Sequence, residues 1–442
     1  MKRWKQNGVF VTMRNMSNDY SVTAQLLKEK ILNRRVAIGI IGLGYVGLPL
    51  AVLAAKKGYT VIGLARDSKK VKELSRGDTA IDTVQKRDLQ YVLTTKKFLP
   101  KKLEVSVLSA LDIIVVCVPT PVTEDKKPDL SAMHSVAKLL VDARIKGKLI
   151  INESTVAPGT TRKLFDCGKN FLACSPERVD PGNRTLTTGT IPKIVGGINP
   201  ESQFLARLFY ENILDAKVIS VSSPEVAEMS KMLENTYRAV NIALVNEFAM
   251  LSEKLQLDVT EVIAAASTKW SFHPHYPGIG VGGHCIPVDP YYILELARSH
   301  KVPMHVTKEA LATNESMPDH VLQLFLQHYQ KGMKTLVYGL TYKKDIADIR
   351  ESPAFVFCRL LEQKKIGFTV YDSLLTESTI RRFDLVPGKL TPVDILVVAT
   401  DHSSLMYDAK KLVSENTIII DGRNAFSTKV GKMVIGIGRL LS

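Results

Sequence analysis

The stretch VAIGIIGLGYVGLPL, residues 36–50, decides the fold of the first part of this chain. It opens with a charge-free apolar run, which is typical of a parallel strand buried on both faces. Gly42, Gly44 and Gly47 follow in a G-x-G-x-x-G spacing, and a helix begins after them. This order predicts a dinucleotide-binding unit whose backbone N–H groups hold a pyrophosphate at the helix N-terminus. The alternative is a tight turn that binds no ligand.

Residues 36–55 carry no charge, so hydropathy alone would allow a membrane-spanning helix. Four glycines and Pro49 interrupt this segment, which favours strand, turn and helix instead. Residues 1–34 form an N-terminal extension that is charged throughout and lacks the apolar core of a signal peptide. Its first dozen residues show no periodicity, which indicates either a disordered tail or a start codon placed too early.

The 442 residues fit two or three domains, and 45% hydrophobic with 23% charged residues is typical of a globular protein. Five cysteines without CxxC spacing indicate neither a disulfide framework nor a metal site, and we expect a reducing cytoplasm. The net charge of +15 is scattered, and no nucleic-acid motif accompanies it. We therefore expect no nucleic-acid partner and no membrane insertion. An anionic small substrate or a generally basic proteome explains the charge.

Strand and helix patterns alternate through the first half of the chain. A helix is expected from about residue 20. The other expected helices lie at 46–57, 70–75 and 130–143, and the expected strands at 36–41, 60–64, 111–118, 148–151, 171–174, 191–195 and 218–219. This alternation predicts a parallel α/β sheet at 35–222, a Rossmann-like domain.

Residues 223–256 contain no glycine and no internal proline, and Ser223-Pro224-Glu225 is a helix start signal. We expect one long helix that joins domains. A loop at 270–290 and further helices to about residue 330 complete a central all-helical domain, 223–330. A second α/β unit follows at 331–442, with a helix at 353–364 and strands at 368–371, 395–399 and 417–421. The fold class is thus α/β, with two Rossmann-like parallel-sheet domains joined by a long helix and a central helical domain.

The loop GVGGHCIPVDPYY, residues 280–292, places Cys285 after three glycines and four positions before Asp289. Little side-chain bulk precedes the thiol, so a substrate carbon can approach it closely, as a nucleophile requires. The alternative is a buried, inert cysteine that packs as a small hydrophobe. The predicted dinucleotide-binding turn, and a lysine elsewhere in the chain that could assist catalysis, favour the interpretation of Cys285 as a nucleophile.

Lys231 and Asn235 stand at i and i+4 on the long helix and share one face. A lysine and an amide side by side can stabilise a developing oxyanion, and the apolar residues around them argue against a solvated face. Glu177 is a candidate base or an ordinary loop carboxylate. Arg350 either pairs with a phosphate or a sugar hydroxyl or is an ordinary surface charge, and the sequence favours neither interpretation.

Three further features concern the cofactor. In VCVPTPV, residues 116–122, Pro119 turns the chain beneath a bound nicotinamide, and in ESTVAPGTT, residues 153–161, Thr155 can face the same pocket. Each alone is more typical of an ordinary loop.

The acidic residue that usually binds the adenosine ribose is missing, because Ala65 and Arg66 occupy the strand end and Asp67 comes two positions late. Without that carboxylate, Arg66 can pair with a 2′-phosphate, which predicts NADP use beside NAD. The alternatives are that Asp67 reaches back or that Arg66 stacks on the adenine.

Eight motifs occur in one order: GLGYVGLPLA, VPTPV, ESTVAPGTT, SPERVDPGN, KMLENTYRAVNIALVNE, PGIGVGGHCIPVDPYY, GLTYKKDIADIRESPA and DGRNAF. Together they resemble the UDP-glucose and UDP-N-acetylhexosamine 6-dehydrogenase family from about residue 34 to 426. The resemblance implies an NAD domain, a central helical dimerisation domain and a C-terminal UDP-binding domain. SPERVDPGN and YPGIGVGGHCIPVDPYY are more similar to the branch that acts on UDP-N-acetylglucosamine, with UDP-N-acetylmannosamine as the main competitor.

The implied reaction oxidises a primary alcohol to a carboxylate with two NAD+ in succession. Cys285 captures the aldehyde as a thiohemiacetal, which becomes a thioester and is hydrolysed. Lys231 and Asn235 match the oxyanion stabilisers, Asp289 the water-activating or cysteine-supporting carboxylate, and Thr155 and Glu177 the water-positioning groups. The implied cofactor-binding residues are Gly42, Gly44, Tyr45, Val46, Gly47, Arg66, Pro119, Thr120 and Thr155. The implied substrate-binding residues are Glu177, Arg178, Lys231, Asn235, Tyr276, Gly280, Gly282, Gly283, Lys343 and Arg350.

Two other functions remain open. A two-electron β-hydroxyacid dehydrogenase shares the first domain and a catalytic lysine, but it needs neither Cys285 nor a second α/β unit. A nucleotide-binding sensor or scaffold would need no catalytic residues at all. Counting NADH per substrate separates the three, since they predict two, one and none.

Overall fold

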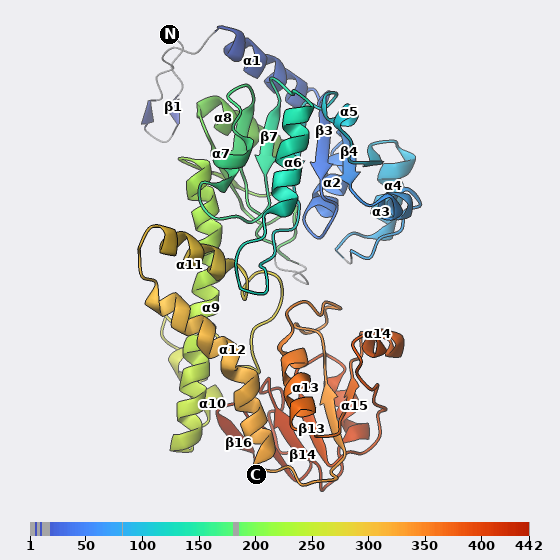
Figure 1. Ribbon diagram of the computed structural model, residues 1–442, viewed down its shortest axis with the longest axis vertical. Helices are drawn as coiled ribbons and strands as arrows, with labels where there is room; N and C mark the ends of the chain where they lie inside the picture. Colours follow the sequence, from blue (N-terminus) through green and yellow to red (C-terminus); the bar gives the residue numbers. More distant parts are fainter. Residues whose placement is uncertain (1–4, 7–8, 11–17, 82, 180–184, 442) are drawn as a thin grey trace. The chain divides into compact units, whose positions relative to one another are not determined.

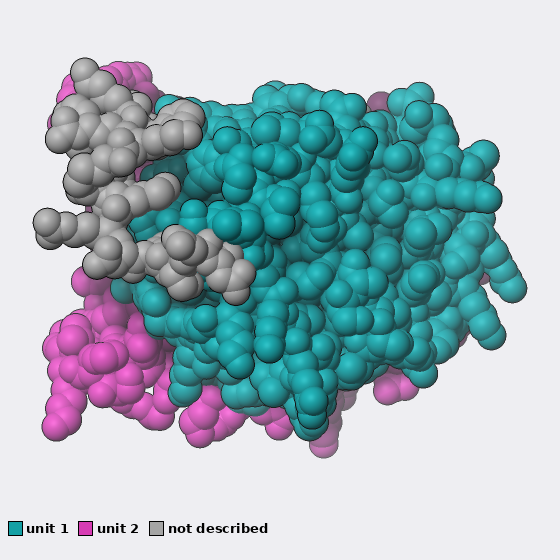
Figure 2. Space-filling model, turned by 90° about the horizontal axis from the view of Figure 1, so that it is seen from above, with its two compact units in different colours: residues 1–123, 128–231 teal, residues 124–127, 232–442 magenta. Residues whose placement is uncertain are grey.

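The computed structural model describes residues 5–6, 9–10, 18–81, 83–179 and 185–441 (Figure 1). It divides into two compact units, residues 1–123 with 128–231 and residues 124–127 with 232–442 (Figure 2). The division falls inside the long helix, and the domain boundaries expected at 34, 222 and 330 stay predictions. The expected N-terminal tail lies mostly outside the described residues. Within it, β1 (Lys5–Gln6) and β2 (Val9–Phe10) pair antiparallel.

The first unit is built on an eight-stranded sheet in the order β10-β9-β8-β7-β6-β3-β4-β5. Its strands are β3 (Ala37–Ile41), β4 (Thr60–Ala65), β5 (Phe98–Lys102), β6 (Ile113–Val116), β7 (Leu149–Asn152), β8 (Phe171–Cys174), β9 (Lys193–Gly197) and β10 (Val218–Val221). All neighbours run parallel except β8 and β9. The predicted parallel α/β sheet is confirmed, with one antiparallel pair added.

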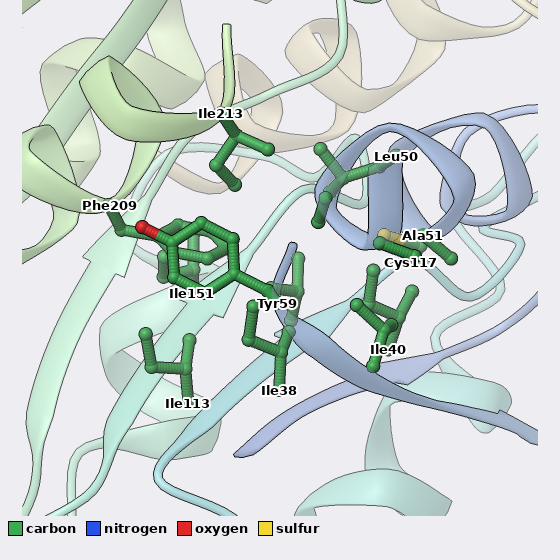
Figure 3. Packing of buried hydrophobic residues seen from close by; sticks show 14 of the residues in the cluster. Ile38, Ile40, Leu50, Ala51, Tyr59, Ile113, Cys117, Ile151, Phe209 and Ile213 are labelled. Carbon is green, nitrogen blue, oxygen red and sulfur yellow. The ribbon is translucent and has the colours of Figure 1, made fainter. Parts of the chain in front are cut away.

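Helices cover both faces of this sheet. They are α1 (Asn18–Leu32), α2 (Gly47–Lys56), α3 (Ser68–Ser75), α4 (Lys86–Thr94), α5 (Val105–Leu108), α6 (Ser131–Asp142), α7 (Thr160–Phe165) and α8 (Pro200–Ile213). Ile113 of β6 packs in one cluster with Leu50 of α2 and Phe209 of α8 (Figure 3). The next residue, Ile114, packs in a second cluster with Met133 of α6. Successive side chains of a strand point to opposite faces, so burial of both faces explains the charge-free apolar runs.

The N-terminal extension is joined to this core by a buried hydrogen bond. The hydroxyl of Tyr59 is fully buried and donates to the carbonyl of Ile31 in α1 at 3.0 Å. A buried hydroxyl without a partner is costly, so this bond fixes the end of α1 against the sheet. Strand β5 was not expected from the sequence, because its residues Pro100, Lys101 and Lys102 are typical of an edge strand and break the apolar pattern.

The central region is helical, as predicted. Its helices are α9 (Pro224–Leu255), α10 (Val259–Ala266), α11 (Asp289–Ser299) and α12 (His305–Leu326). Helix α9 runs through 32 residues with Pro224 in its first position, as the start signal indicated. It is the element in which the division between the two units falls.

The second unit contains a six-stranded sheet in the order β12-β11-β13-β14-β15-β16. Its strands are β11 (Thr335–Tyr338), β12 (Thr369–Tyr371), β13 (Ile395–Val398), β14 (Ile418–Asp421), β15 (Met433–Gly436) and β16 (Arg439–Leu441), and its helices are α13 (Pro353–Gln363), α14 (Glu377–Arg381) and α15 (Leu405–Leu412). Only β15 and β16 pair antiparallel. The predicted second Rossmann-like sheet is confirmed.

The apolar run at 36–55 forms β3 and α2, as expected. Across the described residues, no helix combines the length and the apolar character needed to cross a membrane.

Candidate active site

The three glycines of the first turn have three different physical roles. Gly42 has φ +95°, and a Cβ there would lie 2.4 Å from the carbonyl oxygen of Cys117. A Cβ on Gly47 would lie 1.9 Å from the carbonyl oxygen of Gly42. Gly44 faces open space instead. The turn therefore needs the first and third glycines for its own packing and leaves the second free for a close ligand, as in dinucleotide sites.

The end of α2 at this turn also fits a pyrophosphate. No side chain caps the helix at Val46, although the Leu48 N–H donates to the Gly44 carbonyl at 3.1 Å and Pro49 has no N–H. The positive end of the helix dipole lies at this turn and attracts an anion. The position of this helix end and the geometry of the glycine turn therefore fit the expected NAD pyrophosphate, and no other residue is needed.

The other two predicted cofactor loops lie on neighbouring strands. Thr120 follows β6 and Thr155 follows β7, and the Thr120 hydroxyl donates to the Thr155 carbonyl at 2.7 Å. Since β3 neighbours β6, the glycine turn and both loops share the carboxyl edge of the sheet. Strand order reverses between β3 and β6, which is where such sheets bind ligands.

The ribose end of the site lacks its acidic residue, as the sequence shows. Ala65 ends β4 and is buried, while Arg66 is exposed. Asp67 is the N-cap of α3, and its carboxylate accepts the N–H of Lys69 at 2.8 Å. Because Asp67 serves this helix, its reaching back to a ribose is the less favoured alternative.

Glu177, after β8, lies in a buried ionic cluster. Its Oε2 accepts a hydrogen bond from Lys193 Nζ at 2.7 Å, and Lys193 also lies 3.0 Å from Glu153 Oε2. Burial alone would raise the pKa of Glu177, but Lys193 and two backbone N–H donors outweigh it and hold that pKa below its ordinary value. Burial raises the pKa of Glu153 to about 7, although Lys193 opposes this. Glu177 is therefore ionised and a weak base, which favours the water-positioning role over the role of base.

Lys231 is buried on α9 and forms no ion pair among the described residues. The carboxylate one turn earlier, Glu228, is committed elsewhere, because it accepts the N–H groups of Gly159 at 2.6 Å and Thr161 at 2.8 Å. A buried lysine whose charge is not neutralised by a carboxylate can act on a substrate oxygen.

Asn235 lies one turn after Lys231, and its amide donates to the carboxylate of Asp289. Both side chains are buried. Asp289 begins α11, and its backbone N–H donates to the carbonyl of Cys285 at 2.8 Å. The structure thus brings Asn235, Asp289 and the Cys285 backbone together. One amide N–H of Asn235 is already used in the hydrogen bond to Asp289.

Cys285 is exposed. Cys117, Cys174 and Cys358 are buried, and burial raises the pKa of each of these thiols, so they are chemically inert. The expectation of an accessible thiol is met, and the alternative of a buried cysteine does not apply to Cys285. Burial and the nearby Arg350 lower the pKa of His284, so this imidazole is neutral at pH 7.

Glycines let the Cys285 loop lie against the second Rossmann-like domain. A Cβ on Gly282 would lie 2.5 Å from Cβ of Tyr342, and one on Gly283, which has φ +87°, would lie 2.7 Å from the Tyr342 ring. The Gly283 N–H donates to the Arg350 carbonyl at 2.9 Å. The loop that carries Arg350 therefore sets the position of the thiol loop.

The Arg350 guanidinium lies on Asp348, with Nη2 2.6 Å from Oδ2, and is part-exposed. Lys343 is half-buried in the same loop, and Tyr276 is exposed.

The predicted residues therefore fall into two sets. The glycine turn, Thr120, Thr155, Glu177, Arg178 and Lys231 belong to the first unit, and Asn235, Tyr276, Cys285, Asp289, Lys343 and Arg350 to the second. Glu153 and Lys193 were not among the residues predicted from the sequence, although Glu153 is the first residue of the motif ESTVAPGTT. Among the described residues, no cluster of three or more histidine, cysteine and acidic side chains could hold a metal ion.

Comparison with known proteins matches three successive family domains to this chain. The chain matches the UDP-glucose/GDP-mannose dehydrogenase family: its NAD binding domain over residues 36–214, its central domain over residues 225–316 and its UDP binding domain over residues 336–428.

Two relatives and one solved structure cover nearly the whole chain. A UDP-N-acetyl-D-mannosamine dehydrogenase of Methanococcus aeolicus is 34% identical, covering 90% of this chain and 93% of the relative. A UDP-N-acetyl-D-glucosamine 6-dehydrogenase of Pseudomonas aeruginosa is 33% identical, covering 86% and 92%. A solved UDP-D-ManNAc dehydrogenase from Pyrococcus horikoshii superimposes with a TM-score of 0.82 at 31% identity, covering 91% and 99%.

Fold and site together define an NAD-dependent oxidoreductase with a UDP-binding domain. The chain belongs to the UDP-glucose/GDP-mannose dehydrogenase family, and it is a UDP-sugar dehydrogenase.

Replacing Gly282 by alanine should displace the thiol loop, because the new Cβ has no room beside Tyr342 and the Glu351 carbonyl. We expect a loss of about 1–3 kcal/mol in stability and a larger loss of turnover. Thermal unfolding and NADH production measure the two effects. Gly367→Ala is the matched control, since Gly367 faces open space in the same unit. Equal effects of the two substitutions would contradict this account of the loop.

Replacing Ala65 by aspartate should sharpen selection for NAD, because a carboxylate at the end of β4 repels a 2′-phosphate. We expect the unmodified protein to use NADP measurably. The ratio of kcat/KM for NADP to that for NAD should fall by about tenfold in Ala65→Asp. Arg66→Ala should lower NADP use alone. No NADP turnover in the unmodified protein, together with unchanged NAD affinity in Ala65→Asp, would contradict the prediction.

Proposed function

We propose that the protein oxidises C6 of a UDP-N-acetylhexosamine by four electrons to the uronic acid, with Cys285 as the covalent nucleophile. The observation that carries this proposal is the exposed thiol on a glycine loop, in a chain that also has an NAD-binding domain. A two-electron dehydrogenase has no use for such a thiol. The product is a building block for surface polysaccharide or glycan synthesis.

In this proposal several side chains take part in the reaction. Bound NAD+ accepts the hydrides. Cys285 adds to the aldehyde carbon, which gives a thiohemiacetal and later a thioester, and water cleaves the thioester to the carboxylate. Lys231 stabilises the oxyanion that forms at C6, with Asn235 beside it. Asp289 supports Cys285 or activates water, and Glu177 positions the water that cleaves the thioester. Because the thiol must stay reduced, a cytoplasmic location fits the reaction.

The sugar itself is a choice between two epimers. The relatives named for UDP-N-acetylmannosamine and for UDP-N-acetylglucosamine are 34% and 33% identical to this chain, so identity does not separate them. The motifs favoured UDP-N-acetylglucosamine, and we propose it as the first substrate to assay. UDP-N-acetylmannosamine and UDP-glucose are the alternatives.

The test counts NADH per sugar consumed with these three UDP-sugars. We expect two NADH and one uronic acid per sugar, and a Cys285→Ala variant that forms acid roughly 10⁴-fold more slowly while it still binds UDP-sugar. Cys167→Ala is the matched control, because Cys167 is the other exposed cysteine among the described residues. One NADH per sugar, or wild-type acid formation by Cys285→Ala, would refute the proposal.

We also propose that α9 pairs with a second copy of this chain. Six large apolar side chains are exposed along one stripe of the helix at spacings of three, four and seven: Leu233, Tyr237, Leu244, Phe248, Leu251 and Leu255. Residues at these spacings share one helix face. A contiguous exposed apolar stripe of this kind supports a homodimer.

The dimer is tested by placing a charge in the stripe. Phe248→Glu should shift the sedimenting species from dimer to monomer, because a carboxylate would be buried without a partner. Val141→Glu is the control, since Val141 is equally apolar and exposed but lies on α6. A Phe248→Glu variant that sediments like the unmodified protein would contradict a dimer through α9.

A further inference from the structure

We propose that Lys193 is a positioning residue that holds Glu177 in the orientation needed to place the water for thioester hydrolysis. This inference rests on the proposed function, because it assigns Lys193 to the last step of that reaction. Lys193 does not contact the reacting atoms in this account. It acts through Glu177.

Three N–H donors fix the Glu177 carboxylate. Oε2 accepts from Lys193 Nζ at 2.7 Å, and Oε1 accepts from the backbone N–H groups of Arg178 at 2.9 Å and Val179 at 2.8 Å. The two backbone bonds alone would leave Oε2 without a donor. Lys193 therefore decides the plane in which the carboxylate lies.

Lys193 is itself held in place from several elements. It lies on β9 and is 2% exposed, with Nζ 3.0 Å from Glu153 Oε2 after β7 and 5.4 Å from the Tyr210 ring centroid on α8. The Tyr210 hydroxyl donates to the other oxygen of Glu153. Glu153 Oε2 receives no hydrogen bond of good geometry, so the contact with Lys193 is ionic only. The directed bond of Lys193 is the one to Glu177.

The cost of this arrangement favours a functional reason. Three ionisable side chains are removed from water here, and apolar residues of the same volume would commonly be at least as stabilising. Two carboxylates and one ammonium carry a net charge of −1 when all are ionised. The pKa of Glu153 near 7 lets one proton relieve that charge without disturbing the pair of Lys193 and Glu177. Burial raises the pKa values of the two facing groups, Tyr210 and Cys117, so both stay neutral.

The step that depends on Glu177 is chemically simple. A water oxygen adds to the thioester carbon, the C–S bond breaks, and the products are the carboxylate, the Cys285 thiol and one proton released to solvent. Glu177 orients the water through its fixed oxygen and does not change its own protonation. If Lys193 is lost, both hydride transfers should still occur and only the hydrolysis should slow.

The experiment is rapid mixing of the Lys193→Met enzyme with NAD+ and UDP-sugar. We expect a burst of two NADH per site, then a steady rate lowered about a hundredfold, with UDP-sugar affinity unchanged. Intact-mass spectrometry should detect a UDP-hexuronyl thioester on Cys285 during the slow phase. Lys57→Met is the matched control, because Lys57 pairs with Asp215 at 2.7 Å on the surface of the same unit. A merely structural role for Lys193 would lower the burst and the steady rate together.

A second variant keeps the test decisive if Lys193→Met does not fold. The double variant Lys193→Met with Glu153→Gln leaves Glu177 as the only ion of the cluster, with the same net charge of −1. It should show the same burst and the same adduct. A folded variant of either kind with the normal steady rate and no adduct would overturn the role of Lys193. One NADH per sugar from the unmodified enzyme would instead refute the proposed function, so the two failures are distinguishable.

Discussion

The whole structure depends on the burial of parallel strands on both faces. Ile113 and Ile114 are neighbours in β6, and they pack into two different apolar clusters on opposite sides of the sheet. Such a strand carries no polar side chain that could take part in catalysis. Most candidate groups of the first unit therefore lie where the chain leaves the sheet, at the carboxyl ends of β3, β4, β6, β7 and β8, while Lys193 begins β9 and Lys231 lies on helix α9. The second sheet repeats this rule, since the loop with Arg350 follows β11.

The second constraint is the lack of room around glycines. Gly42, Gly47 and Gly282 each lie so close to backbone or Cβ atoms of other residues that a side chain would clash with them. At the cofactor turn this compactness leaves Gly44 open toward a ligand. At the thiol loop it joins the segment of Cys285 to the loop of Tyr342. At both places glycine lets two segments pack in close contact, and the lack of a side chain leaves space beside them for a ligand.

The sequence predicts most of this fold because its strands are apolar and its helices periodic. Both sheets, the long helix α9 and the glycine turn are confirmed. What it misses includes helix α8 and strand β15, for which no expectation was made, and several polar or non-local features. Strand β5 carries a proline and two lysines, so it lacks an apolar run. The antiparallel pairing of β8 with β9 depends on tertiary contacts. The ionic cluster joins Glu153, Glu177 and Lys193, which are far enough apart in sequence that no local spacing relates them. Likewise, spacing places Asn235 one turn from Lys231, but it does not show that Asp289 takes one of its N–H groups.

The exposure of Cys285 has a chemical consequence beyond the reaction itself. An exposed thiol is within reach of peroxide and of alkylating reagents, whereas Cys117, Cys174 and Cys358 are shielded by the cores around them. Oxidation of Cys285 to a sulfenic acid would block the proposed covalent capture of the aldehyde, and a cellular thiol could reverse it. In the proposed mechanism, the loop geometry that makes the cysteine available therefore also makes turnover depend on the redox state of the surroundings.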